Sequence, residues 1–246
     1  MYSKIPMPPF KWKEEDMADS LLFFPMVGIV IGAAVVVLNV VYPFVSIPVA
    51  VRILLTLLLP LIITGGFHAD GFMDTEDALN SYAPSERKLE IMKDPHLGAF
   101  AVISLVKWLL AYAAALTAIL LNEKCDPGIL LILGITFVIS RSLSGLGALL
   151  FRKAKKSGML YEETKQKRTV VKVFLVAWLL LSAAAMIYLS PIHGGAVLLA
   201  LLLHILYYRY KVYREFGGVT GDTAGYYLTT AEVISAVVLA VVIYLV

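Results

Sequence analysis

The chain has 246 residues, of which 60% are hydrophobic and 16% are charged, and its formal net charge is +3. A soluble domain carries roughly 45–50% apolar and about 25% charged residues, so this composition excludes an ordinary soluble protein. The small basic excess indicates no nucleic-acid partner, because Lys and Arg in a membrane protein mark its cytoplasmic side.

The apolar residues form continuous runs of about 18–22 residues, the length of helix that crosses a hydrocarbon core of about 30 Å. The runs fill most of the chain, which excludes a single-pass anchor, and they lack the alternation of a β-barrel. We therefore predict an all-α, polytopic transmembrane helical bundle, surrounded by membrane lipid and forming one domain over residues 1–246. The seven expected spans cover about residues 26–42, 47–66, 99–121, 128–150, 170–189, 192–207 and 224 to the C-terminus.

The loops between these spans alternate between short turns and long basic segments. The short turns, 42–47, 122–127 and 190–195, contain one Lys or Arg, Lys124. The long segments contain Lys4, Lys11, Lys13, Arg87, Lys88, Lys93, Arg152, Lys153, Lys155, Lys156, Lys165, Lys167, Arg168, Lys172, Arg209, Lys211 and Arg214. Because basic loops stay inside, we expect a multi-pass protein of the cell inner membrane with a cytoplasmic N-terminus, cytoplasmic polar loops and an outside C-terminus.

Small residues recur at a spacing that suits close helix packing. Gly28 and Gly32 form such a pair in the first span, and Gly221 and Gly225 form one at the start of the last span. Pairs of this kind let two helix backbones approach each other, although ordinary glycine usage in membrane helices explains them equally well. The single cysteine, Cys125, excludes an internal disulfide.

The clearest candidate site lies in the stretch 65–77, whose helix is expected to continue the second span directly. Asp70, Asp74 and Asp77 are spaced i, i+4, i+7, which places three carboxylates on one arc of a helix. Mg²⁺ typically takes one or two carboxylates together with substrate phosphates, so the arc predicts a magnesium site. Gly71 would let a ligand approach the backbone. A solvated acidic helix face is the alternative interpretation.

A second motif, Lys93-Asp94-Pro95-His96-Leu97-Gly98, precedes the third span. Lys93 is suited to hold a phosphate as a point charge. It could equally extend its ammonium group to the membrane surface. Taken alone, His96 is expected to be a structural hydrogen-bond donor, and Pro95 to end or redirect any preceding helix.

Arg141 stands within the fourth span, roughly 15 Å from Phe151 at the helical rise of about 1.5 Å per residue. A charge at that depth is costly, so we expect it to face the protein interior or a wet cavity. The sequence favours a substrate phosphate as its partner. An ion pair with an acidic side chain is the competing interpretation.

The glycine-dense turn Gly217-Gly218-Val219-Thr220-Gly221-Asp222-Thr223 opens the last span. Free backbone N–H groups at such a helix start form an anion site. Asp222 could instead be a plain N-cap of the helix.

Five segments together resemble a known family over nearly the whole chain. They are Lys4-Ile5-Pro6-Met7-Pro8, Phe23-Phe24-Pro25-Met26-Val27-Gly28, the stretch 65–78, Leu89-Glu90-Ile91-Met92-Lys93 with its continuation to Phe100, and Gly218-Val219-Thr220-Gly221-Asp222-Thr223. The family is that of the cobalamin synthases, also called adenosylcobinamide-GDP ribazoletransferases. Glu76, Asn80 and Pro95 depart from its pattern, which has Ala, Gly and Ser there.

The resemblance implies the last assembly step of the cobalamin nucleotide loop. A hydroxyl of α-ribazole, or of its 5′-phosphate, attacks the cobinamide-linked phosphorus of adenosylcobinamide-GDP, GMP leaves, and adenosylcobalamin or its 5′-phosphate forms. The implied residues are Asp70, Asp74 and Asp77 for Mg²⁺, Lys93, Asp94, Arg141 and Asp222 for catalysis, and His68, His96 and Gly221 for substrate binding. Lys93 and Arg141 would take phosphate charge, and either Asp94 or Asp222 would accept the hydroxyl proton.

Two other classes of protein share part of this pattern. A CDP-alcohol phosphotransferase-like enzyme would use similar acidic residues and a metal, but its Gly-x-x-Ala-Arg element is absent from the acidic stretch. A transporter would carry acidic residues and broken helices near the membrane midplane, whereas the acidic residues here lie in loops.

Overall fold

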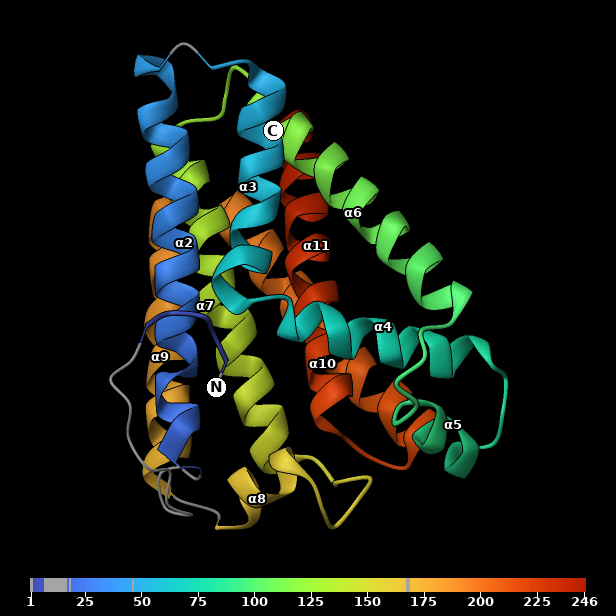
Figure 1. Cartoon of the computed structure of the whole chain (residues 1–246). Helices are drawn as coiled ribbons and strands as arrows, with labels where there is room; N and C mark the ends of the chain where they lie inside the picture. Colours follow the sequence, from blue (N-terminus) through green and yellow to red (C-terminus); the bar gives the residue numbers. More distant parts are fainter. Residues whose placement is uncertain (1, 7–16, 18, 46, 167–168) are drawn as a thin grey trace.

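A computed structural model describes residues 2–6, 17, 19–45, 47–166 and 169–246. No β-strand occurs in these ranges, where a lone bridge joins Lys153 to Val219. Met7 and Pro8 of the N-terminal motif, and the basic residues Lys11, Lys13, Lys167 and Arg168, lie outside the described residues. The helices are η1 Ser20–Phe23, α2 Phe24–Val41, η2 Tyr42–Phe44, α3 Val49–Thr64, α4 Phe67–Asn80, α5 Ser85–Ile91, α6 Ala99–Leu120, α7 Pro127–Leu150, α8 Met159–Lys165, α9 Thr169–Leu189, α10 Pro191–Phe216 and α11 Gly221–Leu245 (Figure 1).

The helices confirm the predicted polytopic bundle. Among the described residues, six helices, the first counted from η1, are long and apolar enough to cross a membrane, and a seventh span is present if α3 and α4 count together. The expected second span is the least regular, because α3 has 16 residues and the chain then bends by 93° into α4. The sixth span is longer than expected, since α10 continues to Phe216.

Helix α7 forms the centre of the bundle. In its most apolar stretch 89% of the residues are buried, against 22–50% in the other long spans. Helix α2 lies along it at close range, because a Cβ added to Gly28 or Gly32 would overlap the backbone carbonyl of Phe137 or Gly134. The predicted packing role of this glycine pair is thereby confirmed.

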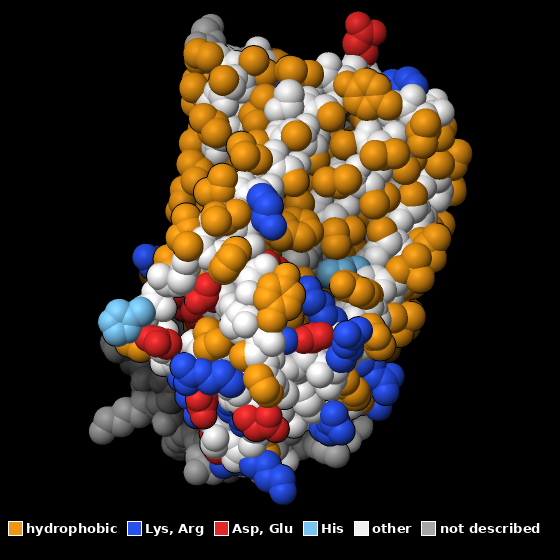
Figure 2. Space-filling model, turned by 90° about the vertical axis from the view of Figure 1, so that its right-hand side faces the viewer, with side chains coloured by type: hydrophobic (Ala, Val, Ile, Leu, Met, Phe, Trp, Pro, Cys, Tyr) orange, Lys and Arg blue, Asp and Glu red, His pale blue; other side chains and the backbone are white. Residues whose placement is uncertain are grey.

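Polar side chains gather at one end of the molecule. Figure 1 places α4, α5 and α8 in the lower half of the view, and Figure 2 shows that most Lys, Arg, Asp and Glu side chains cover that half of the visible face. Hydrophobic side chains dominate the upper half of the same face, where few charged side chains are visible. The long loops predicted to share one side of the membrane therefore do lie together.

Candidate active site

Two glycines turn the acidic segment out of the line of the preceding span. Gly65 and Gly66 both have left-handed backbones, with φ of 69° and 80°, and the Gly66 N–H bonds the Leu61 carbonyl at 3.0 Å. Glycine takes this conformation without the steric cost that other residues bear. Helix α4 thus lies across the bundle, whereas the sequence suggested that it continues α3.

Helix α4 crosses the start of α11 at very short range. A Cβ on Gly71 would lie 2.8 Å from the Asp222 Cα, and one on Gly225 would lie 2.8 Å from the His68 carbonyl oxygen. Thr229 donates a hydrogen bond of 3.3 Å to that carbonyl. Gly71 therefore admits the backbone of α11 and not a ligand, which corrects the expectation. The crossing sets Asp70 and Asp222 on adjoining helices.

The carboxylates at this crossing act on one another. Burial, and then the charges of Asp70, Asp222 and Asp77 in that order, together raise the pKa of Asp74 to about 6. Asp77 also lies against the start of α6, where a Cβ on Gly98 would overlap its carboxylate. In the described part of the chain, no three His, Cys, Asp or Glu side chains stand close enough together to hold a metal ion.

Glu76, which the spacing put off this arc, faces α6. It accepts a hydrogen bond of 2.7 Å from the Ser104 hydroxyl and one of 3.3 Å from the Asn80 amide. Two of the residues that depart from the family pattern, Glu76 and Asn80, are therefore bonded to each other.

A cleft of about 220 Å³, open to solvent, lies between α4, the start of α11 and the loop that follows α7. Asp70 and Asp222 line it together with Gly221, and Lys153 and Lys155 line it from the loop. Acidic and basic groups thus line the same cleft. Such an arrangement suits a phosphorylated ligand bound together with a cation.

Lys155 lines the cleft, although in the sequence it served only as one of the basic residues that indicate the cytoplasmic side. Burial lowers its pKa, the nearby charge of Lys93 lowers it further, and Asp222 opposes both. Lys93 is therefore close enough to act on the cleft, although its own side chain is exposed. The basic run after α7 could have indicated that Lys155 belongs to the site, but a single sequence does not show that this loop contacts α11.

The loop that carries Lys93 begins after α5, and α5 is fixed to α10 by a 2.5 Å ion pair between Lys88 and Glu215. Asp94 accepts hydrogen bonds of 2.9 Å from the His96 backbone and 2.7 Å from the His96 ring. These bonds lower the pKa of the Asp94 carboxyl. His96 thus has the structural role expected of it, and Asp94 is a weak base that already has partners.

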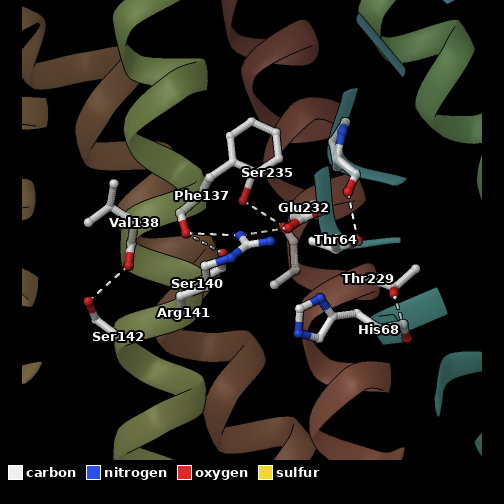
Figure 3. A network of polar contacts seen from close by, with 12 residues as sticks. Thr64, His68, Phe137, Val138, Ser140, Arg141, Ser142, Thr229, Glu232 and Ser235 are labelled. Atoms are coloured by element: carbon white, nitrogen blue, oxygen red, sulfur yellow. Dashed lines mark hydrogen bonds and ion pairs between the residues drawn. The ribbon is translucent and has the colours of Figure 1, made fainter. Parts of the chain in front are cut away.

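Arg141 is buried inside the bundle, with 1% of its side chain exposed. Its guanidinium bonds Glu232 of α11 at 2.9 Å and the Phe137 carbonyl at 3.1 Å (Figure 3). The described residues that line the cleft do not include Arg141. The structure shows the ion pair that the sequence offered as the alternative to a substrate phosphate.

The glycine-dense turn is capped by Thr220, which corrects the expectation that Asp222 could be the N-cap. Thr223 N–H bonds the Thr220 hydroxyl at 3.1 Å, and Thr220 N–H bonds the Thr223 hydroxyl at 2.9 Å. Asp222 is thereby left in the first turn with its carboxylate in the cleft. Gly221 faces open space in the same cleft.

His68 is only 7% exposed and does not line the cleft wall formed by Asp70 and Asp222. Its ring lies near the Arg141–Glu232 pair, as Figure 3 shows, and Nε2 has no hydrogen-bond partner among the described residues. The structure therefore brings Asp70, Asp222 and Gly221 together, sets Lys93 nearby, and leaves His68 and Arg141 deeper in the bundle.

Comparisons with known proteins match nearly the whole chain to proteins of one kind. A family model described as cobalamin-5-phosphate synthase matches residues 1–240. A protein named adenosylcobinamide-GDP ribazoletransferase from Lachnoclostridium phytofermentans is 38% identical, with 99% of this chain and 93% of the relative aligned. Proteins of the same name from Clostridium perfringens and Pseudomonas fluorescens are 31% and 33% identical over 98% and 94% of this chain, and over 95% and 91% of their own lengths. No solved structure matches.

Proposed function

Because the chain belongs to the cobalamin-5-phosphate synthase family, we propose that it joins adenosylcobinamide-GDP to α-ribazole or α-ribazole 5′-phosphate. A P–O bond forms between the ribazole hydroxyl oxygen and the cobinamide-linked phosphorus. The bond from that phosphorus to the bridging oxygen breaks, and GMP leaves with the bridging oxygen. The hydroxyl proton passes to a base, and the products are GMP and adenosylcobalamin or its 5′-phosphate.

The observation that carries this proposal is the cleft with carboxylates on α4 and α11 and lysines on the loop after α7. Transfer at phosphorus depends mainly on positioning and on neutralising charge that develops on the phosphate oxygens. Lys155 and Lys93 supply positive charge at the side of the cleft. The diphosphate would lie between them and the acidic wall.

The acidic wall fits Mg²⁺ in chemistry and charge. Carboxylate oxygens are its preferred protein ligands. Burial and then the repulsion of the neighbouring carboxylates raise the Asp74 pKa, and a bound cation would offset both effects. Asp70, Asp74 and Asp77 would hold the ion once their side chains turn toward one another, and the bound ion would supply charge neutralisation for the diphosphate and the departing GMP.

Asp222 is the better candidate for the base that accepts the hydroxyl proton. It lines the cleft on the first turn of α11, whereas Asp94 is exposed on the loop before α6 and is not among the residues that line the cleft. Gly221, next to Asp222, leaves room for the sugar beside the reacting group. Lys93 and Lys155 would orient the phosphates, and Arg141 would support the bundle that carries the site.

The polar end of the molecule would face the cytoplasm. Its basic loops follow the positive-inside rule, and the nucleotide substrates are charged molecules of the cell interior. The cleft would then open at the cytoplasmic surface of the inner membrane.

The test is turnover by purified protein. Adenosylcobinamide-GDP, α-ribazole and Mg²⁺ should together give GMP and a corrinoid product in equal amounts, and omission of either organic substrate should abolish both. Hydrolysis of adenosylcobinamide-GDP without coupling would contradict the proposal.

A further inference from the structure

A second open pocket, with a volume of about 550 Å³, lies where α7 ends, beside α8 and the last turns of α10. Figure 1 shows α8 at the lower end of α7. Leu149 and Leu150 give the pocket apolar surface, whereas Arg152 and Lys153 give it positive charge. Such a mixture suits a ligand that has an anionic group next to an apolar one.

Two arginines at this pocket contact the same aromatic ring. The Arg152 guanidinium carbon is 5.0 Å from the centroid of the Tyr213 ring, and that of Arg209 is 5.4 Å from the same centroid. Arg209 also lies 5.5 Å from the centroid of Phe151, which lines the pocket. Within the described part of the chain, neither arginine forms an ion pair with a carboxylate. Two neighbouring cations without an acidic partner favour an anion between them.

Arg152 is held in place by bonds that occupy only one edge of its guanidinium group. Its Nε donates a 2.7 Å hydrogen bond to the Gly217 carbonyl, and its backbone N–H donates one of 2.7 Å to the Tyr213 hydroxyl. The two Nη groups of Arg152 have no acceptor among the described residues. A guanidinium fixed in this way can grip two phosphate oxygens and loses little conformational freedom when it does so.

The face of α10 that carries Arg209 continues as an apolar strip toward the middle of the helix. Leu202 and Leu206 precede Arg209 on one helix face, because residues three, four and seven positions apart lie above one another. Both leucines are exposed, at 40% and 60%. In a helix long and apolar enough to span a membrane, this strip meets lipid acyl chains. The order of leucines followed by an arginine matches the order of acyl chain and phosphate in a lipid.

We propose that this pocket binds an anionic phospholipid, with Arg152 and Arg209 on the headgroup phosphate and an acyl chain along Leu206. Basic pockets next to transmembrane helices recognise anionic headgroups in this way. A zwitterionic headgroup also carries a cation, which the two arginines would repel. The lipid site goes beyond the proposed reaction, and its test does not depend on turnover.

The test titrates the full-length protein in a neutral detergent with phosphatidylglycerol or with phosphatidylcholine of the same acyl chains. Native mass spectrometry gives the Kd of the first bound lipid. Each basic side chain near an anionic lipid contributes about 1 kcal/mol, which is about fivefold in affinity. Wild type should therefore bind phosphatidylglycerol at least about tenfold more tightly than phosphatidylcholine. Arg152→Gln and Arg209→Gln should each weaken phosphatidylglycerol binding about fivefold, and the double variant should bind both lipids equally.

Arg214→Gln is the matched control, because Arg214 lies on the same helix but has the Glu215 carboxylate 3.4 Å away. It should change the Kd for phosphatidylglycerol less than about twofold. Arg152→Lys keeps the charge but loses the planar fork, so its Kd should lie between those of wild type and Arg152→Gln.

The comparison of the two lipids on wild type needs no variant, so a variant that fails to fold cannot protect the proposal. Equal wild-type affinity for both lipids would overturn it, and so would an equal loss in Arg214→Gln and Arg152→Gln. Displacement of the bound lipid by millimolar inorganic phosphate would identify a site for a soluble anion and would overturn the lipid assignment.

Discussion

Gly71 and Asp222 hold the two site helices in contact, since a Cβ on Gly71 would lie 2.8 Å from the Asp222 Cα and the same distance from its carbonyl oxygen. Backbone atoms cannot yield as a flexible side chain would, so an added methyl group must separate α4 from α11. The relative position of Asp70 and Asp222 therefore depends on the absence of a side chain at position 71.

Gly71→Ala should lower kcat at least about tenfold, because small misplacements of reacting groups are costly. GMP release measures the effect. Gly195→Ala in α10 is the control, because its nearest neighbour would lie at an ordinary 3.6 Å. Equal activity in both variants would show that the helix crossing does not set the site.

The acidic arc should control metal dependence. A chelator should abolish turnover and Mg²⁺ should restore it, and Asp70→Asn, Asp74→Asn and Asp77→Asn should each remove most activity without loss of folded protein. Glu76→Gln should be far milder, because Glu76 bonds Ser104 away from the cleft. Full activity in Asp74→Asn would refute the assignment.

The ion pair of Arg141 should matter first for stability. Arg141→Ala leaves Glu232 buried without its partner, which costs about 3–5 kcal/mol, so the melting temperature in detergent should fall clearly. Adding Glu232→Ala should recover part of the loss, because the stranded charge is removed. A stable but inactive Arg141→Ala would show the phosphate role that the sequence favoured.

Glu163 should make stability depend on pH. Its folded pKa of about 7 is above the ordinary carboxyl value of 4.5, so the fold favours the neutral acid. That contribution is complete below about pH 4 and is lost as pH rises through about 7. Between about pH 5 and pH 8 the melting temperature of wild type should therefore drop more than that of Glu163→Gln. Parallel curves would contradict this.

Cys125 reports the topology. It stands in the short turn between α6 and α7, which the positive-inside rule puts outside the cell. A membrane-impermeant thiol reagent should label it from the outer face of intact cells. Burial raises its pKa, so labelling should be faster at alkaline pH. Labelling restricted to inverted vesicles would reverse the orientation.

Hydrophobic run length predicted the spans well because each run crosses the membrane as one local helix. It did not predict the 93° bend between α3 and α4, because the helix was expected to run on from the second span through Gly65 and Gly66 into the acidic motif. The acidic spacing identified Asp70, Asp74 and Asp77 as a group, since helical periodicity is local. The sequence thus predicted which residues share a face of a helix, but not how the helices pack against one another.

Contacts between distant segments were the part that the sequence could not supply. Arg141 was expected inside the protein, but its partner Glu232 is 91 residues away. The approach of Lys155 to Asp222, and of Tyr2 to Glu163, likewise joins segments with no common pattern. The sequence shows that a buried charged residue needs a partner, while the packing of the bundle determines which residue that partner is.

The shortness of α3 sets the depth of the chemistry. Sixteen residues span about 24 Å, less than the hydrocarbon thickness of about 30 Å. If α3 begins at the far edge of the hydrocarbon layer, the bend at Gly65–Gly66 falls short of the near edge, and α4 would form the floor of a dent in one leaflet. A large substrate could then rest there with its apolar portion against lipid and its phosphates in the dent. Turnover in vesicles should accordingly vary with acyl-chain length, because a thicker bilayer buries that dent further.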